Sequence, residues 1–61
     1  MKLFLQKNYP SIDRFLLKDV QSKYRTIFKI SLSYDELKKK IEETGLFSIS
    51  NVHRTMYVNR K

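Results

Sequence analysis

The chain contains no cysteine, so no disulfide can hold its fold together. A domain of 61 residues buries only about 60% of its unfolded surface, and domains this small often depend on disulfides, a metal or a partner chain. His53 is the only histidine, and the six carboxylates are scattered, which is too poor a ligand set for a zinc site. We therefore expect one small domain, residues 1–61, that holds no metal or cofactor and is stabilised by packing or by association.

Residues 34–44 carry the clearest pattern of secondary structure. Ser33 is a suitable N-cap, and Glu36 three residues later fits a capping box. Gly45 suits the left-handed position at which many helices end. The apolar face recurs at helical spacing and consists of Tyr34, Leu37 and Ile41. The pattern predicts an amphipathic helix over residues 34–44.

Residues 24–32 alternate between two kinds of side chain, as residues in a strand do. One side would hold Tyr24, Thr26, Phe28, Ile30 and Leu32, and the other Arg25, Ile27, Lys29 and Ser31. This period of two predicts a half-buried strand with one apolar and one cationic face.

Shorter runs predict further strands. Residues 46–50 (LFSIS) alternate, residues 55–58 (TMYV) suit a returning strand, and residues 2–6 (KLFLQ) are a third candidate. The pair Ser50–Asn51 is typical of a turn between the first two runs.

Residues 11–22 fit either a helix or one arm of a hairpin with the 24–32 strand, and we favour the hairpin. Both alternatives give an α+β fold. We expect a small, mostly antiparallel sheet of three to four strands, covered on one face by one amphipathic helix, residues 34–44. Arg25 and Lys29 would then lie on the open face of the sheet.

Catalytic patterns are missing from the sequence. No serine stands in a nucleophile-elbow context, and a single glycine excludes a phosphate-cradling loop. A general base also needs a nucleophile and an oxyanion site, so His53 alone does not indicate an enzyme, although an acid–base pair with a lysine is conceivable. We expect a protein without catalytic activity.

Positive charge is the strongest global feature, because thirteen Lys and Arg stand against six Asp and Glu, a formal net charge of +7. Such a charge favours nucleic acid or an acidic protein as partner. Residues 45–61 contain no carboxylate and mix Tyr, His and Arg, which stack on bases and contact phosphates. The predicted nucleic-acid-binding residues are Lys23, Arg25, Lys29, His53, Arg54, Tyr57, Arg60 and Lys61.

The expected surface, a sheet with aromatic and cationic side chains, suits RNA or single-stranded DNA. No helix-turn-helix is expected, since only one helix is firmly indicated. The lysine run 38–40 is interpreted as a solvated face, because carboxylates one turn away partly neutralise it.

The leading hypothesis is a regulator or accessory factor that binds RNA or single strands. The alternative is a small inhibitor or antitoxin-like adaptor that docks on an acidic surface of a nucleic-acid-processing enzyme, with RNA as a conceivable bridge. Homo-oligomerisation stays open. We expect no membrane partner and a cytoplasmic location, because no secretory or membrane-spanning run is present.

The stretch GLFSISNVHR resembles the signature of a DNA-binding module found beside some homing endonucleases. Residues in step with that signature are Gly45, Leu46, Phe47, Ile49, Ser50, Asn51 and Arg54. His53 takes the place of the family's glycine, and its upstream aromatic positions are missing here. The resemblance covers about a sixth of the chain, so we do not assign the chain to this family on it.

Overall fold

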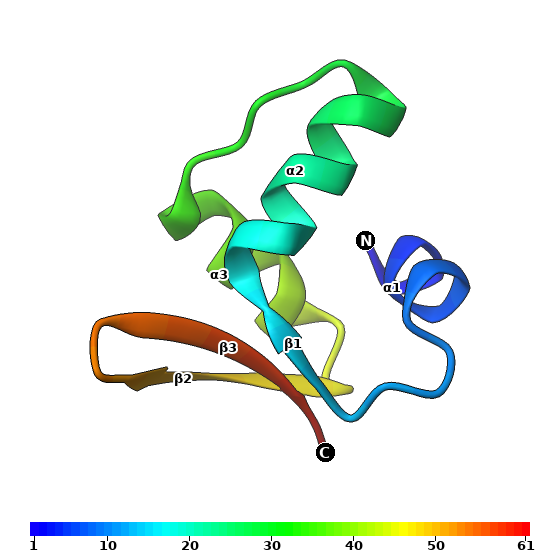
Figure 1. Cartoon of the computed structure of the whole chain (residues 1–61). Coiled ribbons are helices and arrows are strands. Elements are labelled where there is room, and N and C mark those ends of the chain that lie inside the picture. Colours follow the sequence, from blue (N-terminus) through cyan, green and yellow to red (C-terminus); the bar gives the residue numbers. More distant parts are fainter.

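Three helices and a three-stranded antiparallel sheet make up the fold (Figure 1). The computed structural model describes residues 1–61. In chain order the elements are α1 (Lys2–Asn8), β1 (Arg14–Leu16), α2 (Leu17–Phe28), α3 (Tyr34–Glu43), β2 (Phe47–Val52) and β3 (Thr55–Arg60). The predicted α+β class is confirmed at this level, but the expectation of a single helix is wrong.

The helix predicted over residues 34–44 is confirmed as α3. Ser33 Oγ accepts a hydrogen bond from the Glu36 backbone N–H at 3.2 Å, so the predicted N-cap is formed. Leu37 and Ile41 are fully buried, as their spacing predicts. The chain leaves the helix through Gly45, whose φ of 74° is the left-handed conformation that glycine adopts without strain.

The strand predicted over residues 24–32 is wrong, because α2 continues to Phe28. Leu17 and Val20 are fully buried and Tyr24 packs against the core, so the inward residues follow the spacing of a helix. The two patterns coincide here, since Tyr24 and Phe28 are four residues apart and would share a face in a helix and in a strand alike.

The loop 29–33 joins α2 to α3. The helix ends at Lys29, which has a left-handed backbone with φ of 60°. Gln21 Nε2 donates to the Leu32 carbonyl at 2.8 Å and holds the loop against α2. Helices α2 and α3 are therefore consecutive in the chain, where the sequence firmly indicated one helix.

The hairpin favoured for residues 11–22 is not formed. Within that region only Arg14–Leu16 is a strand, and it pairs with β3 rather than with residues 24–32. Helix α2 starts at Leu17, so the helical alternative describes part of the region better.

The strand predicted over residues 2–6 is wrong, because these residues lie in α1. Phe4 and Leu5 are both buried while Leu3 is 79% exposed, which a strand with alternating faces would not give. Seven residues make only about two helical turns, too short a run to show a helical period in the sequence. The Phe4 ring meets Tyr24 edge-on, with centroids 5.5 Å apart, and attaches α1 to α2.

The strands predicted over residues 46–50 and 55–58 are confirmed as β2 and β3. They form an antiparallel hairpin, and β1 adds to the other edge of β3, which gives the order β1-β3-β2. The turn predicted at Ser50–Asn51 is wrong, since both residues are paired within the ladder.

Both α2 and α3 lie against one face of the sheet, and α1 lies at the side of α2 away from the hairpin (Figure 1). The core between them consists of Phe4, Leu5, Tyr9, Phe15, Leu17, Val20, Leu32, Leu37, Ile41, Phe47 and Val58. The Tyr9 and Phe15 rings stack within it, with centroids 3.9 Å apart. No helix has the length and apolarity that crossing a membrane requires.

Candidate nucleic-acid interface

The turn of the β2–β3 hairpin consists of His53 and Arg54. Val52 pairs with Thr55, so only these two residues connect the strands. Their φ angles are 50° and 66°, and two positive φ values in succession are the mark of a type I′ turn. Such turns favour Asn and Gly, because other side chains crowd the backbone in this conformation. The chain therefore holds an exposed histidine and an exposed arginine in strained positions, and strain of this kind often marks a functional site.

Arg54 also lines a hollow of about 180 Å³ beside the turn of the hairpin. The hollow brings together the ends of four elements, through Leu16, Lys18, Tyr34, Arg54, Thr55 and Met56. Two of these side chains are cationic and none is acidic. This arrangement can accept an anionic group such as a phosphate between the start of α2 and the hairpin.

Arg25 extends the cationic surface along α2. Lys18 and Arg25 are seven residues apart in the helix, so they lie on one face about 10 Å from each other along its axis. Gln21 lies between them and contacts the α2–α3 loop, so this flank of α2 faces α3 and away from α1. Both basic side chains are exposed, and neither forms an ion pair.

The outer face of α3 carries mixed charge. It forms a shallow depression lined by Asp35, Lys38, Lys39, Glu42 and Glu43. Two lysines thus stand among three carboxylates, and a phosphate backbone laid along this face would meet repulsion as well as attraction.

The open face of the sheet differs from the expected one. Arg25 and Lys29, which the sequence placed there, lie in α2 and in the following loop. Tyr57 does lie in β3, but the Arg14 guanidinium covers its ring at 3.9 Å from the centroid. A base that stacked on Tyr57 would have to displace this arginine or stack on top of it.

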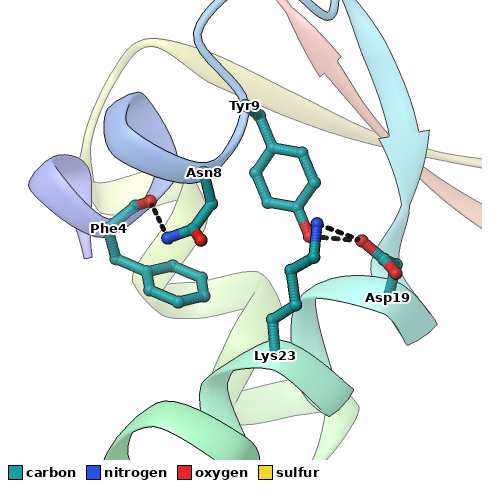
Figure 2. A network of polar contacts seen from close by, with 5 residues as sticks. All are labelled: Phe4, Asn8, Tyr9, Asp19 and Lys23. Carbon is teal, nitrogen blue, oxygen red and sulfur yellow. Dashed lines mark hydrogen bonds and ion pairs between the residues drawn. The ribbon is translucent and has the colours of Figure 1, made fainter.

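Lys23, also predicted to contact nucleic acid, lies on the opposite flank of α2 in a polar network (Figure 2). Its Nζ is 3.3 Å from Asp19 Oδ2 and 4.5 Å from the centroid of the Tyr9 ring. Tyr9 donates a hydrogen bond to the same carboxylate. Burial, followed by this hydrogen bond and the negative charge of Asp19, raises the pKa of Tyr9 above its ordinary value of 10.0. Lys23 thus serves this network and not the surface beside the hairpin.

Arg60 has structural partners as well. Its Nη2 donates to the Tyr9 carbonyl at 2.6 Å, and its Nε lies 3.6 Å from Asp13 Oδ1. The guanidinium lies over the Phe47 ring, 5.1 Å from the centroid. These contacts fasten the end of β3 to the segment between α1 and β1. Lys61 follows at the end of the chain, where its backbone N–H donates to the Leu46 carbonyl.

Of the predicted residues, Arg54 lines the hollow, His53 precedes it in the turn, and Arg25 lies on the same face of α2 as Lys18. Lys18 and Tyr34 line the same hollow but were missed. Lys18 could have been found from its seven-residue spacing to Arg25 once residues 17–28 are interpreted as a helix.

No three residues of the types that bind metals, His, Asp or Glu, lie close enough together to hold an ion. Comparison with protein-family models, with curated proteins and with solved structures finds no match to the chain.

Proposed function

We propose that this protein binds nucleic acid through the turn of the β2–β3 hairpin and the adjacent flank of α2. One observation carries the proposal. A strained two-residue turn presents His53 and Arg54 directly beside a hollow that contains Lys18 and no acidic side chain. Arg25 continues this cationic surface, and the net charge of +7 supplies long-range attraction to a polyanion.

Duplex nucleic acid fits this surface better than the single strands favoured on the sequence alone. Binding of single strands relies on exposed aromatic rings on which bases stack. Tyr9 is buried, Tyr24 packs on Phe4 and Arg14 covers Tyr57, so Tyr34 is the one tyrosine that is exposed. Phe28 is exposed as well, but it lies in a groove beside α1 and not at the hairpin. A protruding hairpin, in contrast, has the shape that enters a groove, while basic side chains beside it contact the phosphates.

The order of the elements supports the same choice. A helix pair, α2 and α3, is followed directly by a hairpin with a basic turn. Winged helix-turn-helix domains, which bind duplex DNA, have this order. The comparison concerns element order alone and adds to the argument from the residues. The proposal includes no catalytic step.

The test is fluorescence anisotropy with a labelled DNA duplex of about 20 base pairs and its separated strands, over a series of salt concentrations. We expect tighter binding to the duplex. Lys18→Gln with Arg54→Gln should weaken duplex binding and make the slope of log affinity against log salt shallower by about 1.8, because each phosphate contact contributes about 0.9.

The matched control is Lys2→Gln with Lys7→Gln, which removes the same charge from α1. It should weaken binding only slightly, because α1 lies away from the hairpin (Figure 1). An equal loss in both double variants would show attraction to net charge alone and would contradict the proposed surface. Absence of binding to any nucleic acid at low salt would contradict the function itself.

A further inference from the structure

Large apolar side chains stay exposed on the side of the molecule occupied by α1. Leu3 is 79% exposed, Ile27 51% and Phe28 47%. They lie around a groove of about 350 Å³ between α1 and the end of α2, lined by Leu3, Phe4, Lys7, Asn8, Ile27 and Phe28. Four of the six lining residues are apolar. The depression on α3 has no apolar lining residue, and three of the six residues that line the hollow beside the hairpin are apolar. Apolar surface gathered in this way marks an interaction site more often than single exposed residues do.

The floor and one wall of the groove are already ordered. The Phe4 ring packs against Phe28 at a centroid distance of 5.8 Å, and both rings also contact Tyr24. Asn8 Nδ2 donates to the Phe4 carbonyl at 2.8 Å, which closes the last turn of α1 (Figure 2). A ligand would therefore enter a preformed site and pay little entropy for ordering it.

Charge identifies the kind of occupant. The lining of the groove contains no acidic residue, and neither α1 nor the stretch 22–33, which holds the end of α2 and the loop after it, contains one. Lys7 lies in the lining, Lys2 lies in the same helix, and Lys29 directly follows α2, whereas Lys23 is paired with Asp19. A second copy of this chain, docked groove to groove, would place lysines against lysines without a compensating carboxylate. A segment whose apolar side chains are flanked by Asp or Glu would complement both the groove and its rim.

We propose that this groove binds an acidic amphipathic helix of another protein. The mode is that of a helix whose apolar side chains, spaced three and four residues apart, fill a groove between two helices. Lys7 lies in the lining itself and would pair with a carboxylate of the partner. Ile27, which lines the groove, is nine residues from Lys18 and therefore lies on the opposite side of α2, so a bound partner would leave the hollow beside the hairpin turn free for nucleic acid.

The probe is a synthetic peptide of about 15 residues with leucines at positions i, i+3, i+4 and i+7 and glutamates elsewhere. A matched peptide carries lysine in place of each glutamate. Titration followed by the amide shifts of the labelled protein gives affinity and location together. We expect the glutamate peptide to bind at least about tenfold more tightly than the lysine peptide, with the largest shifts in α1 and at the end of α2.

Leu3→Ser with Ile27→Ser should weaken this binding by about tenfold or more, because both side chains would be anchors. Ile12→Ser is the matched control, since Ile12 is 46% exposed and does not line the groove. Lys7→Gln should weaken the glutamate peptide and leave the fold intact. Three results would overturn the proposal: no binding at about 1 mM peptide, shifts centred on the hairpin, or self-association that the serine substitutions at Leu3 and Ile27 abolish.

Discussion

Tyr9 donates a hydrogen bond from Oη to Asp19 Oδ2 at 2.5 Å and thereby joins the segment after α1 to the first turn of α2. Only 1% of the Tyr9 surface is exposed, and its ring stacks on Phe15 in the core. The stability of the core around Tyr9 therefore depends on the protonation of Tyr9, because its hydroxyl must keep its proton to donate this hydrogen bond.

Stability should therefore fall in alkaline solution. The pKa of Tyr9 is raised in the folded protein, so above pH 10 the unfolded chain loses a proton that the folded chain retains. The stabilisation is fully present below pH 10 and is lost as pH rises beyond it, at up to about 1.4 kcal/mol per pH unit for this one group. Urea unfolding at a series of pH values measures the effect.

Tyr9→Phe separates Tyr9 from the other groups that titrate in this range. The variant should lose about 1 kcal/mol of unfolding free energy near neutral pH, because the hydrogen bond is removed. Its stability should then decline less steeply above pH 10 than that of the unaltered protein. Parallel pH profiles for the two proteins would contradict this prediction, because they would mean that Tyr9 has the same pKa in the folded and the unfolded chain.

Arg60→Lys should destabilise the fold by about 1 to 2 kcal/mol although it keeps the charge. A lysine cannot reproduce the guanidinium that reaches the Tyr9 carbonyl and also lies over the Phe47 ring. Arg54→Lys is the matched control and should change stability little, because Arg54 is exposed in the turn. Thermal unfolding compares the two variants, and equal stabilities would mean that the Arg60 contacts are replaced by water at no loss.

Ile41→Ala should lower the unfolding free energy by about 2 to 4 kcal/mol, because Ile41 is fully buried between α3 and the rest of the core. Val52→Ala serves as control, since Val52 is 40% exposed and should contribute about 0.5 kcal/mol or less. Urea unfolding of both variants checks the difference, and a small effect at Ile41 would contradict the packing of α3.

The parts of the fold that could be predicted are those with local signals. Ser33 and Gly45 mark the ends of α3, and alternation marks β2 and β3. Helix α2 was mistaken for a strand because Tyr24 and Phe28 suit both periods. The turn at His53–Arg54 carries no Gly or Asn, so its sequence gives no hint of the conformation it adopts.

The candidate site was predictable in part for similar reasons. Charge and the mixture of Tyr, His and Arg indicated Arg25, His53 and Arg54, and of these Arg54 lines the hollow beside Lys18. Arg60 looked equivalent in the sequence, yet the carbonyl that it binds belongs to Tyr9, 51 residues away. A partner so distant in the chain becomes visible only when the sheet and the α1–β1 segment are assembled.

His53→Asn with Arg54→Gly is the substitution that would test the hairpin turn most directly. These residues are the preferred pair for a type I′ turn, so relief of the left-handed strain should raise the unfolding free energy by about 1 to 2 kcal/mol. The same change removes the exposed imidazole and guanidinium, so duplex binding should weaken and its salt slope should become shallower by about 0.9. Urea unfolding and anisotropy on one preparation measure both effects. A gain in stability with unchanged binding would show that the turn does not contact nucleic acid. A loss of stability would show that the His53 and Arg54 side chains make contacts that stabilise the fold by more than the strain costs.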